Sequence, residues 1–350
     1  MLKLTSLRDK GVALLSRAYK TLYKGWRGQR APDNYKTLDR SSENELRAAL
    51  FKHYYGFASE EDFQNDRVRL TQAEKEFILN TDLPAQLFSR IKTTRERIIP
   101  WLDDQVSLSG KKILEIGAGT GCAAVALAEK CDWVTAVDIE AKGLQLAEIR
   151  ANLYGVKNID FMNTNATEVF DAIEPKKYKI VIFYACLEHM TMDERIVALS
   201  KAWKYLEADD YLIIIESPNR LFWYDSHTAF MPFFHTLPYE LALKYVKHSP
   251  RPALAKSLEG LSQEDAFVRL SRWGMGFGYQ EIEVALETTV SRLRFMEDLV
   301  SFELRTRHFA LEEDALNRKT FKRFFEIRNI EMPPIGFFNL NVDIILQKTL

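Results

Sequence analysis

The sequence predicts an α/β fold in which a mostly parallel sheet is layered with helices. The composition, with 47% hydrophobic and 28% charged residues, is that of an ordinary globular protein. From residue 112 onward, short apolar runs alternate with segments that have helical periodicity. A glycine-rich turn joins the first of these runs to the segment that follows it. Strands separated by helices in this way are typical of a parallel sheet with right-handed crossovers.

The chain divides in sequence into a helical N-terminal region, 1–109, and an α/β domain, 110–350. The first region has apolar residues at helical spacing in three segments, which are 42–56, 71–80 and 86–103. We expect the end of the last segment to lead into the first strand, with Pro100 near its end. This helical region is a candidate cap over a site or a candidate dimer contact.

Seven strands are expected in the α/β domain. Five alternate with helices: 113–116, 133–137, 158–162, 180–184 and 211–216. Two later candidates are 280–286 and 341–347, with charged helices over about 288–330 between them. Between the fifth strand and these elements lies a segment rich in aromatic residues, about 221–275. We interpret it as an insertion that shapes a substrate pocket.

Charge is distributed unevenly along the chain, whose formal net charge is −1. Residues 1–30 hold eight Lys and Arg residues against one Asp, in an amphipathic pattern. Three interpretations stay open for this segment: a helix packed on its own domain, contact with an anionic membrane or partner, and a targeting peptide. The rest of the chain is acidic, which disfavours nucleic acid as a partner.

The three cysteines do not have the spacing of a zinc site or of a disulfide framework. They are Cys122, Cys131 and Cys186. Their small number favours a reducing, cytoplasmic setting. The basic segment 1–30 adds the alternative that the protein is peripheral at the membrane surface.

The central motif is the run Leu114-Glu-Ile-Gly-Ala-Gly-Thr-Gly121, which follows one predicted strand and opens a helix. Its glycines are spaced Gly-x-Gly-x-Gly, unlike the Gly-x-Gly-x-x-Gly of dinucleotide folds. Glu115 suits a ligand with an ammonium group and would repel a pyrophosphate. Asp138 ends the second strand, where an acid can accept hydrogen bonds from ribose hydroxyls. A ligand with a ribose, an amino-acid tail and no phosphate is S-adenosylmethionine.

These residues resemble the class I methyltransferase superfamily, which has a Rossmann-like seven-stranded sheet. The resemblance implies that the last strand, 341–347, runs antiparallel and lies beside the fifth. Further motifs that match are Thr164-Asn-Ala166 after the third strand and Tyr184-Ala-Cys-Leu-Glu-His-Met190 after the fourth. The cofactor-binding residues that the resemblance implies are Glu115, Gly117, Ala118, Gly119, Gly121, Asp138, Ile139, Asn165, Ala166 and Tyr184. Asn165 stands where the family usually has Asp.

A second, finer resemblance concerns the acceptor side. The stretches Ser217-Pro-Asn-Arg220, Asp225-Ser-His-Thr228 and His235-Thr-Leu-Pro238 are similar to a group of bacterial small-molecule or glycan methyltransferases. The Asn/Asp-Pro-Pro-aromatic run of enzymes that methylate nucleobases is absent after the fourth strand, so a DNA-methylating enzyme is disfavoured.

Methyl transfer to a hydroxyl oxygen benefits from a general base, for which histidine is the usual residue. The candidate catalytic residues are His189, His227, His235 and Asp225, and Glu188, Glu216 and Asn219 lie close to them in sequence. The competing interpretation is that the histidines only hydrogen-bond the backbone of packed loops. No metal is expected, since the spacing matches no known ligand set; a site of Asp225, His227 and His189 is the less favoured alternative.

The function predicted from these features is methyl transfer from S-adenosylmethionine to a small-molecule, sugar or lipid-linked acceptor, most favourably on oxygen. A sulfur or nitrogen acceptor is the first alternative. The others are a non-catalytic subunit or sensor that binds the cofactor, and a nicotinamide-dependent oxidoreductase. The expected partner is a small molecule, and an oligomer is compatible with the sequence.

Overall fold

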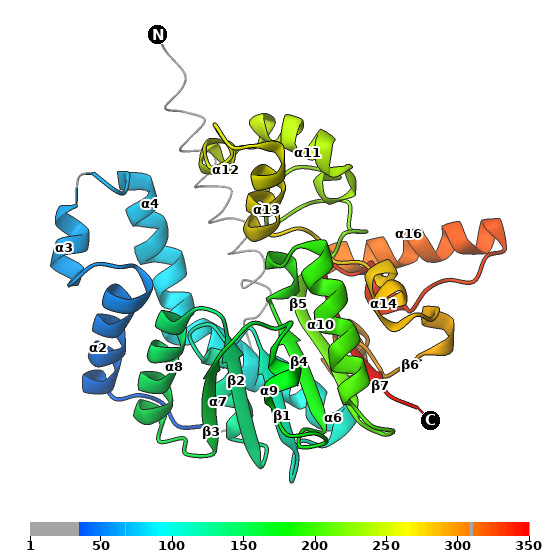
Figure 1. Ribbon diagram of the computed structural model, residues 1–350, viewed down its shortest axis with the longest axis horizontal. Helices are drawn as coiled ribbons and strands as arrows, with labels where there is room; N and C mark the ends of the chain where they lie inside the picture. Colours follow the sequence, from blue (N-terminus) through cyan, green and yellow to red (C-terminus); the bar gives the residue numbers. More distant parts are fainter. Residues whose placement is uncertain (1–34, 67, 308–310, 350) are drawn as a thin grey trace. The chain divides into compact units, whose positions relative to one another are not determined.

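A computed structural model describes residues 35–66, 68–307 and 311–349 (Figure 1). The basic segment 1–30 therefore lies outside the described residues. The strands form a seven-stranded sheet in the order β3-β2-β1-β4-β5-β7-β6, which confirms the α/β class predicted from the sequence. By its internal contacts the chain divides into two compact units, one that ends at Val169 and one that begins at Phe170.

The first unit contains three parallel strands: β1 (Lys112–Ile116), β2 (Trp133–Asp138) and β3 (Ile159–Asn163). The carboxyl ends of the three strands lie at the same edge of the sheet, because Ile116 pairs with Val137 and Asp138 pairs with Asn163. Two helices connect them, α7 (Cys122–Ala128) and α8 (Ala141–Tyr154). All seven residues of α7 are buried, which suits a short helix of Ala, Val, Leu and Cys. The predicted strands agree with these bounds to within one residue.

A helical layer precedes β1, as expected for this part of the chain. It consists of α2 (Arg40–Ala49), η1 (Leu50–Tyr54), α3 (Glu60–Asn65), α4 (Gln72–Phe77), η2 (Ile78–Asp82), η3 (Ala85–Ser89), α5 (Arg90–Thr93), η4 (Thr94–Ile98) and α6 (Ile99–Val106). Figure 1 shows α2 beside α8, and Leu146 of α8 belongs to the same apolar cluster as Leu46, Leu50 and Phe51. The helical layer is thus anchored on the helix that follows β2.

The second unit contains β4 (Ile180–Tyr184), β5 (Tyr211–Pro218), β6 (Arg294–Phe295) and β7 (Asn341–Gln347). β7 runs antiparallel to both β5 and β6 and lies between them, as the resemblance implied for the last strand. The helices that accompany them are α9 (Val169–Ala172), α10 (Met192–Tyr205), α14 (Tyr279–Leu286), α15 (Leu299–Arg307) and α16 (Glu312–Arg328), with the short turns η8 (Val290–Arg292) and η9 (Ile335–Phe338).

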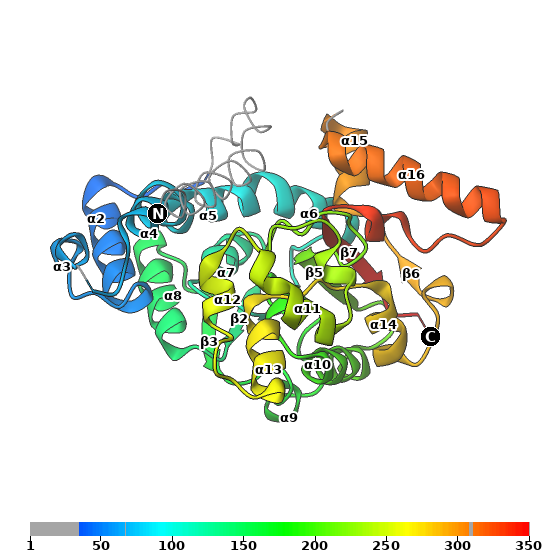
Figure 2. The same cartoon turned by 90° about the horizontal axis from the view of Figure 1, so that it is seen from above.

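The aromatic-rich segment after β5 forms a small helical layer of its own. Its elements are η6 (Phe234–Thr236), α11 (Tyr239–Tyr245), η7 (Val246–His248), α12 (Pro252–Lys256) and α13 (Gln263–Trp273). They lie together in Figure 2. A separate apolar cluster holds them, and it includes Met231, Phe234, Leu254, Leu270 and Met275. The insertion is therefore a packed substructure and not an open loop.

One prediction of local structure is wrong. Residues 280–286 were expected to form a strand, but they belong to helix α14, and the sixth strand is the two-residue β6. Glu281, Ile282 and Ala285 are buried while Val284 is 63% exposed, which is a helical pattern. The helical segment predicted over 86–103 continues to Val106 before β1 begins. Pro100 is tolerated because it lies in the first turn of α6, where its missing N–H is not needed.

Among the described residues, no helix combines the length and the apolar character that crossing a bilayer requires.

Candidate functional site

The glycine loop lies between β1 and α7, at the carboxyl edge of the first unit's strands. Gly117, Gly119 and Gly121 have φ angles of 87°, 50° and 76°, a region that residues with a Cβ seldom occupy. The Gly119 N–H donates to Asp138 Oδ2 at 2.7 Å, and the Glu140 N–H donates to Asp138 Oδ1 at 2.8 Å. Asp138 thus holds the loop against the end of β2, and its carboxylate retains lone pairs for a ligand.

The glycines differ in what surrounds them. A Cβ on Gly121 would lie 2.5 Å from Ala147 Cβ, so this glycine permits α7 and α8 to pack closely. A Cβ on Gly119 would meet no atom within 4 Å. The loop backbone at Gly119 therefore faces open space, into which a ligand can approach the main chain.

Glu115 provides an independent test of whether the loop fits a cationic cofactor. The side chain is 1% exposed, and its Oε2 atom has no hydrogen-bond partner among the described residues. Burial, together with the nearby Asp138 carboxylate, raises the pKa of Glu115 to about 8. A buried carboxylate with one oxygen that has no described partner fits a ligand that brings hydrogen-bond donors and positive charge. The amino-acid end of S-adenosylmethionine has both, so the residues present fit this cofactor.

Arg150 and Gln86 support the loop from behind, and sequence reasoning missed both. The fully buried Arg150 guanidinium donates from Nε to the Thr120 carbonyl at 2.8 Å and from Nη2 to the Gln86 carbonyl at 2.9 Å. The Thr120 hydroxyl donates to Gln86 Oε1 at 2.8 Å. An Arg at a helical position that the pattern marks as buried was the signal that could have pointed to this support.

The remaining predicted cofactor residues of this unit follow β2 and β3. Ile139 is 66% exposed directly after Asp138, so its apolar side chain can contact a ring such as adenine. Asn165 Oδ1 accepts from the Thr167 N–H at 3.0 Å and from its hydroxyl at 3.1 Å. Its Nδ2 group is therefore suited to donate to a ring nitrogen. Ala166 is buried beside it.

In the second unit, the ends of β4 and β5 carry strained backbone. Ala185 has φ 46° and Glu216 has φ 55°, although neither is glycine. Tyr184 donates from its hydroxyl to Glu216 Oε1 at 3.4 Å. Backbone strain of this kind tends to occur at functional sites. The predicted cofactor role of Tyr184 stays a prediction.

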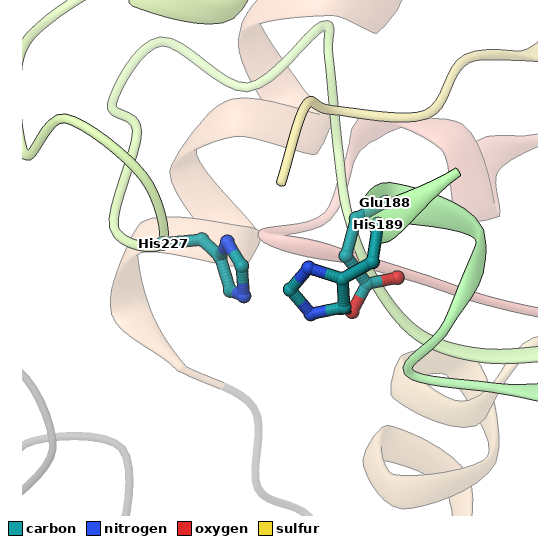
Figure 3. A group of neighbouring side chains, drawn as sticks. All are labelled: Glu188, His189 and His227. Atoms are coloured by element: carbon teal, nitrogen blue, oxygen red, sulfur yellow. Dashed lines mark ion pairs between the residues drawn. The ribbon is translucent and has the colours of Figure 1, made fainter. Parts of the chain in front are cut away.

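Three candidate acceptor-side residues lie together after these strands. Glu188 and His189 form the short helix η5 (Leu187–His189), and His227 comes from the segment after β5. Figure 3 shows the two imidazole rings facing one another, with the Glu188 carboxylate beside His189; the ring centroids are 5.3 Å apart. Glu188 is buried, and this burial raises the pKa of its carboxyl group.

Asp225 and His235 lie elsewhere, in the interior of the insertion. Both are 3% exposed, and His235 Nε2 lies 3.2 Å from Asp225 Oδ1. The Asp225 carboxylate also accepts from the backbone N–H groups of His227, Thr228 and Ala229. Burial lowers the pKa of His235, although Asp225 opposes this effect. This geometry is that of a loop-holding pair, in which three backbone N–H groups and His235 already face the Asp225 carboxylate.

The aromatic residues predicted to line a pocket divide into two groups. Phe222, Phe230 and Phe234 are buried. Trp223 and Phe233 are 42% and 57% exposed, and the Phe233 N–H donates to the Trp223 carbonyl at 2.7 Å. Tyr224, the sixth aromatic residue predicted there, is half-buried, so Trp223 and Phe233 are the most exposed of the six.

Residues 113–209 match the family model described as a methyltransferase domain. The chain is 28% identical over 114 residues to the ubiquinone biosynthesis O-methyltransferase of Azoarcus sp. (strain BH72), covering 33% of this chain and 48% of that protein. It is 32% identical over 92 residues to the enzyme of the same name from Stutzerimonas stutzeri (strain A1501), covering 26% of this chain and 39% of that protein. The chain thus spans half or less of the length of these curated relatives.

Among solved structures, the chain is similar to magnesium protoporphyrin IX methyltransferase from Synechocystis PCC 6803 with bound S-adenosylhomocysteine. The identity is 14% and the TM-score 0.40, with coverage of 74% of this chain and 92% of that one. The family match at 113–209 includes β1, the glycine loop, Asp138 and β4. This match and the curated relatives support a methyltransferase domain of the class I, S-adenosylmethionine-dependent type over these residues.

Proposed function

We propose that this protein transfers a methyl group from S-adenosylmethionine to an oxygen atom of a small-molecule acceptor. The observation that carries the proposal is the buried Glu115 carboxylate, which has no described partner for Oε2 and lies at the start of a loop with open space beside Gly119. S-adenosylmethionine supplies an activated methyl group and an ammonium group for this carboxylate.

The residues of the first unit take the cofactor-binding roles in this proposal. Glu115 faces the amino-acid end, and Asp138 accepts from the ribose hydroxyls while it holds Gly119. Ile139 and Asn165 contact the adenine ring. Gly117, Ala118 and Gly119 let the loop backbone approach the ligand closely, and Gly121 supports the loop by permitting α7 to pack on α8. These roles follow from burial and from donor and acceptor geometry at each position.

His189 and His227 take the acceptor-side roles. Their rings are partly exposed, so an acceptor can reach them, whereas His235 and Asp225 are buried and we assign them the positioning of the loop around His227. The exposed pair Trp223 and Phe233 gives an aromatic surface suited to an apolar or aromatic acceptor. Oxygen as the acceptor atom agrees with the names of the curated relatives, which are O-methyltransferases.

The alternatives from other classes fit less well. A nicotinamide cofactor would place a pyrophosphate near the Asp138 carboxylate, where like charges repel, and it would bring no ammonium group to the buried Glu115. A subunit that binds the cofactor without catalysis gives no reason for the strained residues at the ends of β4 and β5. A sulfur or nitrogen acceptor would need no base if it were already nucleophilic, and the test below distinguishes it by product analysis.

Calorimetric titration with S-adenosylmethionine, S-adenosylhomocysteine and NADH is the first test. We expect one site per chain for the first two ligands with micromolar affinity, and no binding of NADH. Asp138→Ala should weaken both affinities at least tenfold, while Asp160→Ala, an acid on β3, serves as the matched control. Binding of NADH alone would overturn the proposal.

An acceptor screen then reads out S-adenosylhomocysteine release with phenols, sugars, thiols and amines. O-methylated product that disappears in His189→Ala and His227→Ala supports the proposal. Product on nitrogen or sulfur, or turnover that is unchanged in both variants, contradicts the assigned acceptor atom or the assigned residues.

A further inference from the structure

The second unit brings two imidazoles and one carboxylate together from segments far apart in sequence. Each of Glu188, His189 and His227 offers one ligating atom, and these atoms all lie within 4.8 Å of one another (Figure 3). We infer that Glu188, His189 and His227 bind one divalent metal ion of the kind that prefers imidazole and carboxylate ligands, such as Zn²⁺, Co²⁺ or Mn²⁺. This departs from the sequence-based expectation of a site without metal.

The tautomer of His189 suits a ligand role. His189 Nδ1 lies 3.0 Å from the carbonyl oxygen of Arg272, and a carbonyl can only accept. Nδ1 therefore carries the proton and Nε2 carries the lone pair. Nε2 lies 3.9 Å from Glu188 Oε1. A metal-ligating histidine commonly donates its other ring N–H to a backbone carbonyl in this manner, which fixes the ring.

The His227 ring is also held through its Nδ1 atom, in this case by a hydroxyl group. Its Nδ1 lies 3.2 Å from Thr228 Oγ1, and the Thr228 hydroxyl donates its own proton to the Gly274 carbonyl. Thr228 Oγ1 must then accept from Nδ1–H, so the lone pair of His227 is again on Nε2. Gly274 makes this placement possible, because a Cβ there would lie 2.4 Å from His227 Cε1. Both rings are thus oriented through their Nδ1 atoms by partners outside the cluster.

The side chains around Glu188 leave its carboxylate able to accept a bound cation. The Glu188 side chain is 2% exposed. Among the described residues, its carboxylate accepts from the Ser217 hydroxyl at 3.4 Å and lies near His189 Nε2. The nearby Arg195 guanidinium donates to the Glu188 backbone carbonyl and forms its ion pair with Glu281 instead. His189 is 45% exposed, so an ion can enter from solvent.

The dimensions are close to those of a metal site. Donor atoms at about 2.0–2.2 Å from a shared ion lie roughly 3 to 4 Å from one another. The widest separation in the cluster, within 4.8 Å, therefore needs to shorten by about 1 to 2 Å, which side-chain rotation about χ angles provides. Three protein ligands leave at least one position for water or for an acceptor oxygen, as in catalytic metal sites.

The role of the ion rests on the proposed function. A hydroxyl bound to a divalent cation loses its proton more readily, which favours a nucleophilic acceptor at neutral pH. The acceptor oxygen then forms a bond to the methyl carbon, and the bond from that carbon to sulfur breaks with its electron pair passing to sulfur. The proton passes to water, and the cofactor product is neutral at sulfur.

Metal titration of the full chain tests the inference without reference to turnover. Protein dialysed against EDTA and then against metal-free buffer is titrated with ZnCl₂ in a calorimeter, and with CoCl₂ by visible absorption. We expect one ion per chain with a Kd below about 10 μM. His227→Ala and Glu188→Gln should each weaken binding about a hundredfold or more, whereas His248→Ala, an exposed histidine outside the cluster, should not.

Thr228→Val keeps the three ligands but removes the acceptor for His227 Nδ1–H, and a loss of about ten- to a hundredfold in metal affinity is expected. Thermal melting of each variant verifies that it is folded. Stoichiometry below one ion per chain in the wild type, or equal affinity in the wild type and His227→Ala, overturns the site. Intact S-adenosylmethionine binding without metal binding rejects the metal site alone, and metal binding without cofactor binding rejects the proposed function alone.

Discussion

Glu115 is a buried carboxylate whose surroundings favour the neutral acid as long as no cation faces it. Its pKa of about 8 lies above the ordinary value for Glu because of burial first and of Asp138 second. The stability that this group contributes to the folded protein is therefore fully present below about pH 4.5 and is lost as the pH rises through about 8. A bound ammonium group would reverse this preference.

Glu115→Gln is expected to remove this pH dependence. In the absence of cofactor, the wild-type Tm should fall between pH 6 and pH 9 more than the Tm of the variant, as measured by differential scanning calorimetry. The variant should bind S-adenosylmethionine roughly ten- to a hundredfold more weakly, since a hydrogen bond to a charged group is lost. Equal affinity of the two proteins at pH 8 would show that the carboxylate does not contact the ligand.

The glycines of the loop give a matched pair of variants. Gly119→Ala should cost about 1 kcal/mol of folding stability, for the positive φ alone, while it weakens cofactor binding because its Cβ enters the open space beside the loop. Gly121→Ala should lower stability by about 3 kcal/mol or more, since its Cβ meets Ala147. Urea unfolding and calorimetry separate the two effects; the opposite ranking in stability would contradict this assignment.

Individual residues also show how much of the site could be predicted from the sequence. Glu115, Asp138 and the glycines were found because their chemistry and their spacing are local in sequence. Arg150 and Gln86 were missed because they act on the loop from 30 and 34 residues away from Thr120, through contacts that no local pattern shows. Two of the predicted histidines, His189 and His227, lie together in the structure, whereas the third is held by Asp225.

At the scale of elements, α14 shows why a strand was predicted where a helix forms. The run Gln280-Glu-Ile-Glu-Val-Ala-Leu286 alternates polar and apolar residues at its start, which indicates a strand. The contacts that favour the helix come from residues distant in sequence. Glu281 forms an ion pair with Arg195 of α10 at 3.1 Å, and α10 and α14 pack together. The five main strands were predicted well because each is a short apolar run with helices on either side.

Arg195 is expected to hold these elements together. It is fully buried and donates to the backbone carbonyls of Glu188, Met275 and Gly276 as well as to Glu281. Arg195→Met should lower the free energy of unfolding by about 3–5 kcal/mol, because it leaves Glu281 and the carbonyls without their donor. Lys201→Met on the same helix removes a more exposed ion pair with Asp171, and a change below about 1 kcal/mol is expected in the same urea experiment.

For the whole molecule, the most uneven feature is the distribution of charge along the chain. Residues 1–30 have a strongly basic amphipathic pattern and lie outside the described residues. Contact with an anionic surface predicts a dependence on salt that packing on the protein itself does not.

Vesicle flotation measures this directly. If residues 1–30 contact lipid, the full chain should bind vesicles with 30% phosphatidylglycerol at 50 mM NaCl and lose most of this binding at 500 mM NaCl, whereas a chain that begins at residue 35 should stay unbound in both. Binding that is equal for the two chains, or that ignores salt, would contradict the membrane interpretation.

The antiparallel strand β7 has a consequence for how the protein is made. Its partner β5 ends at Pro218, and β7 begins only at Asn341. At an elongation rate of about 5 to 20 residues per second, a ribosome needs on the order of ten seconds to synthesise the intervening chain. During that time the hydrogen-bonding groups along one side of β5 have no strand to pair with. The nascent chain therefore depends on chaperones, or on the early folding of the insertion, to avoid pairing with other chains.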